Sequence, residues 1–273
     1  MTTTEIRSLT FRLTTSGAGS VEVTATDRGE GNLFLLLHGG GGPQTMTGFA
    51  ELLSNQKHAR VIVPTHPGFG GTHRPDALNS VKELAVLYVA LLDDLDLSHV
   101  TVVGNSIGGW IAAEIGLLAS PRVSSVVVVD AVGIDVPDHP VADFFSLTLD
   151  QVAQLSYHDP IKFRIDPTTL PPSVQAAMPG NRASLATYAG TLMTDPTLAG
   201  RLAGTTVPTL VVWGEADQIA DPDYGRAFAN AIPGASFQLL TATGHLPQIE
   251  TPEKLLDLIW DFAERHPKEN LVD

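Results

Sequence analysis

The segment GNSIG at residues 104–108 holds a serine with a glycine two residues away on each side. It follows the apolar run VTVV (100–103), which is typical of a strand, and precedes the helix-like segment WIAAEI (110–115). A sharp turn from strand to helix crowds the backbone, so the flanking positions must lack side chains while the serine is exposed. The helix N-terminus would also face negative charge that develops at the serine. The pattern therefore predicts that Ser106 is a nucleophile.

A serine hydroxyl is a weak nucleophile and needs a base, which His245 and Asp217 can supply together. Asp217 follows the strand-like run 209–213, and His245 follows the run 236–240. Loops at the carboxyl ends of parallel strands meet at one edge of a sheet. We expect Ser106, Asp217 and His245 to converge there, with His245 as the base and Asp217 as the group that orients it.

Two other carboxylates compete with Asp217 for the role of the acid. Glu215 lies on the same predicted loop, and Asp130 ends the earlier apolar run 126–129. The Asp217 loop lies nearer to the histidine loop in the expected strand order, which favours Asp217. In that case Asp130 is expected to cap a turn or helix.

Four glycines, Gly39 to Gly42, follow His38 directly after the apolar run 33–37. A tetrahedral intermediate needs backbone N–H groups that point at its oxyanion, and glycines let the backbone approach closely. We assign these donors to the amides of Gly40 and Ile107, the second being the residue after the candidate nucleophile. His38 is expected to anchor this loop through hydrogen bonds.

Neither a nucleotide site nor a metal site is favoured. Pro43, Gln44 and Thr45 follow the glycines, so the lysine of a phosphate-binding loop is missing. His66 and His73 lie near a second glycine-rich segment, but no carboxylate or cysteine completes a ligand set, and surface or loop positions are expected for them. The sequence predicts no cofactor and no metal.

The elements that must position these residues alternate between strand and helix. Two β-leaning stretches flank the turn-like segment SGAG and predict an antiparallel pair at a sheet edge, and short apolar runs with helical patterns between them follow. The clearest helices are 80–95, which Ser80 can cap, and 252–264, which closes the chain. The expected strands are 8–14, 20–25, 33–37, 61–63, 100–103, 126–129, 209–213 and 236–240. Together they predict an α/β fold with a mostly parallel sheet covered by helices.

The alternation breaks after Asp130, where residues 134–203 contain helical patches, many Pro and Asp, and no strand-like run. We expect residues 1–133 and 204–273 to form the core and residues 134–203 to form an inserted helical cap. Arg164 and Arg182 in this segment could hold a substrate carboxylate, although exposed cap arginines are the simpler expectation.

The composition limits the kinds of partner. Lys and Arg number 16 against 30 Asp and Glu, and the resulting net charge of −14 repels phosphate backbones and anionic lipid surfaces. The absence of cysteine excludes disulfides and a thiolate nucleophile. The N-terminus has no signal-peptide pattern, and the run 33–37 is too short to span a bilayer. We expect a cytoplasmic protein that acts on a small molecule, without nucleic-acid or membrane partners; its oligomeric state does not follow from the sequence.

Five segments resemble successive landmarks of the α/β-hydrolase superfamily: HGGGG, PTHPGFGGT, GNSIGGW, VPTLVVWGEAD and GHLPQIETPE. The glycine run and the Gly-Asn-Ser turn are similar to hydrolases that cleave carbon–carbon bonds in ring-fission products, and other landmarks resemble esterases, enol-lactonases and cofactor-free haloperoxidases. The carbon–carbon hydrolases usually carry an aromatic residue after the catalytic histidine, whereas Leu246 and Pro247 follow His245 here. Serine at the nucleophile position disfavours the related haloalkane dehalogenases and epoxide hydrolases.

The resemblance implies an α/β-hydrolase fold and acyl transfer to water through a Ser-His-Asp triad. An ester or a lactone is the expected substrate. The alternatives are hydrolysis of a carbon–carbon bond in a vinylogous diketone, a cofactor-free perhydrolase, and a retired hydrolase that binds a small molecule without turnover.

Overall fold

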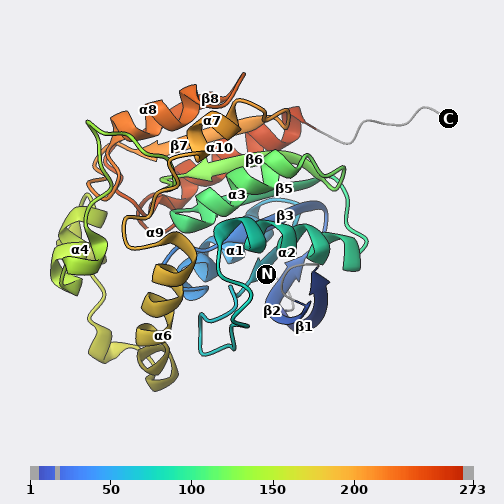
Figure 1. The fold of residues 1–273 in the computed structure, drawn as a ribbon, viewed down its shortest axis with the longest axis horizontal. Coiled ribbons are helices and arrows are strands. Elements are labelled where there is room, and N and C mark those ends of the chain that lie inside the picture. The colour runs from blue at the N-terminus through green and yellow to red at the C-terminus, as the bar shows by residue number, and fades with distance from the viewer. Residues whose placement is uncertain (1–5, 16–18, 267–273) are drawn as a thin grey trace.

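A single sheet of eight strands forms the centre of the computed structural model, which describes residues 6–15 and 19–266 (Figure 1). Strands β3 to β8 run parallel, whereas β1 and β2 run antiparallel to their neighbours. In spatial order the strands are β1 (Ile6–Thr15), β2 (Gly19–Gly29), β4 (Ala59–Pro64), β3 (Asn32–Leu37), β5 (Val100–Asn105), β6 (Val123–Val129), β7 (Thr209–Gly214) and β8 (Ser236–Leu240). The predicted α/β architecture and its mostly parallel sheet are confirmed. Most of the turn predicted between β1 and β2 lies outside the described residues.

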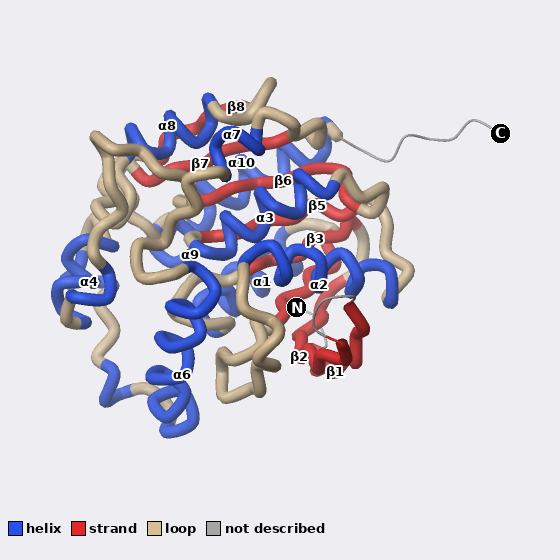
Figure 2. The backbone as a smooth tube through the Cα atoms, viewed as in Figure 1, coloured by secondary structure: helices blue, strands red, loops and turns tan. Residues whose placement is uncertain are grey.

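Helices cover both faces of this sheet (Figure 2), which explains why its inner strands are apolar without interruption. Successive residues of β3 pack on opposite sides, with Leu35 and Leu37 in one buried cluster and Phe34 and Leu36 in the other. The first cluster includes residues of α2 (Val81–Asp94), α3 (Ile107–Leu118) and α8 (Pro222–Asn230). The second includes residues of α1 (Gln44–Gln56) and α10 (Pro252–Arg265). No helix within the described ranges has the length and apolarity needed to cross a bilayer.

Helices of three to 18 residues, without a named strand among the described residues, connect β6 to β7. They are η1 (Phe144–Ser146), α4 (Leu149–Ser156), α5 (Pro160–Phe163), η2 (Pro167–Thr169), α6 (Pro172–Ala189) and α7 (Leu198–Leu202). Figure 1 shows α4 and α6 projecting beyond the sheet at the left of the view. These helices lie inside residues 134–203, and we call this segment the insertion; its behaviour as a separate cap domain stays a prediction.

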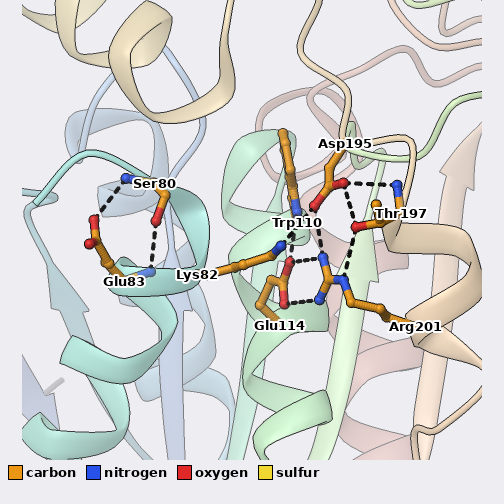
Figure 3. Close-up of polar contacts among 8 residues, drawn as sticks. All are labelled: Ser80, Lys82, Glu83, Trp110, Glu114, Asp195, Thr197 and Arg201. Carbon is orange, nitrogen blue, oxygen red and sulfur yellow. Dashed lines mark hydrogen bonds and ion pairs between the residues drawn. The ribbon is translucent and has the colours of Figure 1, made fainter. Parts of the chain in front are cut away.

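An ion cluster joins the C-terminal end of the insertion to two core helices (Figure 3). Arg201 of α7 contacts both carboxylate oxygens of Glu114 on α3, at 2.6 and 2.7 Å, and lies 2.9 Å from Asp195. Lys82 of α2 lies 3.2 Å from Asp195. Glu114 is only 4% exposed, so its charge depends on the bidentate contact with Arg201. The same close-up shows Ser80, which caps α2 as predicted, together with Glu83.

Two buried histidines anchor the loop that follows β3. The rings of His38 and His66 are 3.7 Å apart, and both side chains are fully buried. The backbone N–H of His66 donates to Nε2 of His38 at 3.1 Å, so Nδ1 of His38 carries the proton and donates to the carbonyl of Gly39 at 2.7 Å. His66 in turn donates from Nε2 to the carbonyl of His38 at 2.9 Å and accepts from Tyr88 at Nδ1. The expected anchoring role of His38 is seen here.

His66 lies in a loop, one of the two positions expected for it, but it is buried and not at the surface. Burial lowers the pKa of His66 to about 4, although the hydrogen bond to the His38 carbonyl opposes this shift. Burial, reinforced by His66, also lowers the pKa of His38 well below its usual value. Both imidazoles are therefore neutral at neutral pH.

This pair predicts a loss of stability in mild acid. An unfolded histidine has a pKa of about 6.5, above the value of about 4 for folded His66, so the unfolded chain gains its proton first as the pH falls. Stability is then lost between these two values. Going from pH 7 to pH 5 should cost about 2 kcal/mol through His66 alone. Urea unfolding of the wild type and His66→Gln at both pH values measures this, and an equal drop in the two proteins would contradict it.

The Glu114–Arg201 contact predicts that removing one partner costs more than removing both. Arg201→Met would leave the buried Glu114 carboxylate unpaired and lower the free energy of unfolding by about 3 kcal/mol. The double variant with Glu114→Gln should recover most of that loss. Arg122→Met, whose partners Asp93 and Asp96 are exposed, is the control and should change little. Denaturant unfolding of the four proteins gives the comparison; a double variant less stable than Arg201→Met would refute it.

Candidate active site

Ser106 occupies the turn between β5 and α3, with φ +59° and ψ −123°. A residue with a side chain rarely adopts a positive φ, so the surrounding backbone must hold it there. Its N–H donates to the carbonyl of Val129 at 3.0 Å, and its own carbonyl accepts from Gly109 and Trp110 at 2.9 and 3.2 Å. These bonds from β6 and from the first turn of α3 hold the predicted strand-to-helix turn in its strained form.

The glycines on either side of Ser106 are required by close contacts of the backbone. A Cβ atom at Gly104 would lie 1.9 Å from the carbonyl oxygen of Gly108, and one at Gly108 would lie 2.2 Å from the carbonyl oxygen of Leu37. Gly39 also packs against the turn, since a Cβ there would lie 3.1 Å from Cβ of Ser106. The glycine loop after β3 and the turn at Ser106 are therefore in direct contact.

The loops after β7 and β8 bring Asp217 and His245 together. Nδ1 of His245 lies 2.8 Å from Oδ2 of Asp217, and both residues are buried. The other oxygen of Asp217 accepts from the N–H groups of Ile219 and Ala220 at 2.8 and 3.3 Å, which fixes the plane of the carboxylate. With Nδ1–H donated to Asp217, a neutral His245 presents Nε2 as its proton acceptor.

Asn105, the residue before Ser106, connects the serine turn with the histidine loop. Its Nδ2 donates to the carbonyl of His245 at 2.9 Å, and its Oδ1 accepts from Gln248 of α9 (Pro247–Glu250) at 3.0 Å. The Ser106 hydroxyl itself makes no hydrogen bond to another described residue; contacts of this kind often tighten only when substrate binds. The sequence analysis did not single out Asn105 or Gln248, and the position of Asn105 beside the serine was the available signal.

The amides of Gly40 and Ile107 have no hydrogen-bond partner within the described ranges. Ile107 is the first residue of α3, so its N–H is one of the donors that a helix leaves free at its N-terminus. A Cβ at Gly40 would lie 2.9 Å from the side chain of Leu185 on α6, so the insertion packs against the glycine loop. Their role as donors to an oxyanion stays a prediction.

Asp130 lies near Asp217 and is fully buried directly after β6. Its Oδ1 accepts from the N–H of Gly214 at 2.7 Å, and its Oδ2 has no donor among the described residues. The expectation that Asp130 caps a turn or helix is wrong, because its partner is the last residue of the neighbouring strand β7. Burial raises the pKa of Asp130 well above its usual range, and the negative charge of Asp217 raises it further. Glu215, the other rival, accepts from the N–H of Ala242 on the exposed side of the loop.

Asp130, Asp217 and His245 each have one potential metal-ligating atom within 4.8 Å of the others. Hydrogen bonding already occupies Asp217, because Ile219, Ala220 and His245 all donate to it. The arrangement is therefore suited to orienting an imidazole more than to holding a cation.

The insertion contacts the site through the backbone of α4. The N–H of His245 donates to the carbonyl of Ser156 at 2.7 Å, and the N–H of Gln218 donates to the carbonyl of Leu155 at 3.0 Å. A Cβ at Gly244 would lie 2.2 Å from the Ser156 carbonyl oxygen. Helices α4 and α6 thus meet the two sides of the site, α4 at the histidine loop and α6 at the glycine loop.

Arg164 and Arg182, the two arginines considered as ligands for a substrate carboxylate, have partners within the insertion itself. Arg182 donates to the carbonyls of Phe144 and Phe145 at 3.2 and 2.7 Å, and its guanidinium lies over both rings. Arg164 is exposed and pairs with Asp150 at 3.1 Å. For Arg164 the expectation of an exposed arginine agrees with the structure, whereas Arg182 is partly buried and holds the start of the insertion.

Comparisons with known proteins identify relatives of this chain and solved structures with a similar fold. A 2-hydroxymuconate semialdehyde hydrolase of Pseudomonas putida is 28% identical over 260 residues, covering 86% of this chain and 88% of that protein. A 2-hydroxy-6-oxo-2,4-heptadienoate hydrolase of the same species is 33% identical over 164 residues, which cover 51% of this chain and 59% of that protein. The solved structure of a thermophilic esterase from Thermogutta terrifontis has the same fold, with a TM-score of 0.74 at 24% identity over 96% of this chain and 100% of that one.

The profile of the alpha/beta hydrolase family matches residues 34–258, which include the serine turn and the loops after β7 and β8. The sheet order and these loops are those of that fold. The chain therefore belongs to the alpha/beta hydrolase family.

Proposed function

We propose that this hydrolase cleaves an uncharged carboxylic ester or lactone by acyl transfer through Ser106. The observation that carries the proposal is the 2.8 Å contact between His245 and Asp217, on loops that Asn105 connects to the strained turn at Ser106. The free amides of Gly40 and Ile107 add the donors that a tetrahedral intermediate needs.

In the proposed mechanism, Ser106 Oγ attacks the carbonyl carbon while Nε2 of His245 takes the hydroxyl proton. The carbonyl oxygen becomes an oxyanion that the amides of Gly40 and Ile107 stabilise. When the intermediate collapses, the carbon–oxygen bond to the leaving alcohol breaks and His245 returns the proton to that oxygen. Water then attacks the acyl-enzyme by the same route in reverse, and Asp217 stabilises the imidazolium at both stages.

The contacts of Arg164 and Arg182 in the insertion favour an uncharged acyl group. Arg182 is committed to two carbonyls and two rings, and Arg164 is paired with Asp150 away from the site. Neither guanidinium is free to bind a substrate carboxylate. The net charge of −14 also disfavours an anionic substrate.

A second candidate is hydrolysis of a carbon–carbon bond in a dienoate, which the names of the two Pseudomonas relatives favour. The same serine, base and amides can attack a vinylogous ketone and expel a carbon leaving group. Leu246, in the position where the resemblance leads us to expect an aromatic residue, argues against it. Assays with p-nitrophenyl esters, lactones and ring-fission dienoates, together with a peroxide-dependent perhydrolase assay, separate the candidates.

The expected cytoplasmic location and lack of a nucleic-acid partner stay predictions.

Ser106→Ala should lower turnover of the best ester by at least about 10³-fold, because the nucleophile is removed. A fluorophosphonate probe should label the wild type rapidly and leave the variant unlabelled. Unfolding should be nearly unchanged, and Ser146→Ala on the surface of the insertion is the control. Turnover at the wild-type rate in Ser106→Ala would rule out this mechanism, and a wild type that neither labels nor turns over would favour the binding-protein alternative.

Asp217→Asn should lower kcat by about 10³- to 10⁴-fold, because an amide can hold the imidazole in the wrong tautomer. Asp223→Asn on α8 is the matched control, since Asp223 is exposed and pairs with Arg226. Comparable losses in the two variants would remove Asp217 from the mechanism.

The pH dependence of the wild type gives a further check on the same base. A histidine must be neutral to accept a proton, and kcat/KM should therefore fall as the medium turns acidic. Dialysis against a chelator should leave the rate unchanged. A chelator-sensitive rate that is flat from about pH 5 to 8 would instead indicate metal-assisted hydrolysis.

A further inference from the structure

We propose that Asp130 is a positioning residue of this site: a neutral carboxylic acid whose Oδ2–H donates a hydrogen bond to the Asp217 carboxylate. The inference rests on the proposed function for its effect on turnover. The protonation of Asp130 itself is a property of the resting protein and can be measured without substrate.

The two carboxyl groups lie close together after two adjacent strands, with Asp130 directly after β6 and Asp217 on the loop after β7. Asp130 has a positive φ of 42°, and its N–H donates to the carbonyl of Val212 on β7 at 3.0 Å. Its Oδ1 is held by the N–H of Gly214 at 2.7 Å. Oδ2 is buried without a donor, and a carboxyl oxygen of Asp130 lies within 4.8 Å of a carboxylate oxygen of Asp217.

Two carboxylates cannot both stay ionised in such a buried site, because their repulsion is poorly screened there. The donors decide which one keeps the proton. Among the described residues, Asp217 accepts three hydrogen bonds, from Ile219, Ala220 and His245, whereas Asp130 accepts one, from Gly214. The negative charge is therefore stabilised on Asp217, and the proton belongs on the unpartnered Oδ2 of Asp130.

The charges that face Asp130 agree with this assignment. Asp217 comes from the loop after β7, and Glu250 of α9 adds a second negative charge. Glu250 is itself held by the N–H groups of Gly244, His158 and Asp159. His245 is the nearby group that can carry a positive charge, and its Nδ1–H already donates to Asp217. Burial and both carboxylates raise the pKa of Asp130, and only the Gly214 bond lowers it.

A neutral Asp130 serves the base in two ways. Its hydrogen bond gives Asp217 a fourth donor, so the carboxylate keeps one orientation toward Nδ1 of His245. It also leaves a single negative charge beside the imidazole. A second charge there would favour the imidazolium form, and His245 would then be a poor base at neutral pH.

Infrared spectroscopy of the resting protein tests the proton directly. A protonated carboxyl group absorbs at a higher frequency than a carboxylate or an amide. At pH 8 exposed Asp and Glu are ionised. The wild-type spectrum minus that of Asp130→Asn should then show an acid carbonyl band that shifts in D₂O. A difference spectrum without this band would overturn the proposal.

Two variants test the positioning role. Asn is neutral and can donate to Asp217 while accepting from Gly214, so Asp130→Asn should keep kcat within about threefold and leave the acid limb of kcat/KM in place. Asp130→Leu has a similar shape but no donor, and its kcat should fall about 10- to 100-fold with little change in KM. A loss in Asp130→Asn as large as in Asp217→Asn, or an acid limb moved to lower pH, would mean that Asp130 is ionised and would overturn the proposal.

If Asp130→Leu fails to fold, the infrared band and Asp130→Asn still decide the question. The outcomes also separate this inference from the proposed function. An acid band in a protein whose Ser106 neither labels nor turns over an ester would refute the proposed function and still support the proton assignment.

Discussion

In the turn between β5 and α3, backbone carbonyl groups lie so close to Gly104 and Gly108 that neither position has space for a side chain. The arrangement of the site depends on this close backbone packing. The carbonyl oxygen of Leu37 approaches so closely that the glycine loop after β3 has to lie against the turn. The serine and the two free amides are consequently positioned by the backbone of three adjacent segments. Side chains enter only as supports, as Asn105 does for the histidine loop.

Buried ionisable groups around this turn are arranged so that few of them carry an unpaired charge. His38 and His66 are neutral because burial lowers the pKa of both imidazoles. Glu114 is balanced by Arg201. Beside His245, the negative charge of Asp217 is likewise compensated, because its carboxylate accepts hydrogen bonds from Ile219 and His245. A buried charge without a partner costs much free energy of desolvation. Because these buried groups are neutral or paired, the polar site can lie in the packed interior at the carboxyl ends of the strands.

The strands and helices could be predicted from sequence because their signals are local: apolar runs for the strands, glycines for the turns and Ser80 for the start of α2. The approach of Asp217 to His245 could also be predicted, since parallel strands end at one edge. Other features depend on contacts between distant segments. The burial of His66 requires its pairing with His38 on another loop. A carboxyl at a strand end looks the same in sequence whether it caps a turn or, like Asp130, bonds a neighbouring strand.

The hydrogen bond from the His245 N–H to the Ser156 carbonyl couples the position of α4 to that of the histidine loop. Helix α6 meets the core differently, through side chains such as Ser184, which donates to the carbonyl of Gly68, and Tyr188, which donates to that of Pro67. Any hinge motion that lifted α4 would therefore drag the histidine loop with it, whereas α6 could pivot by exchanging side-chain partners for water.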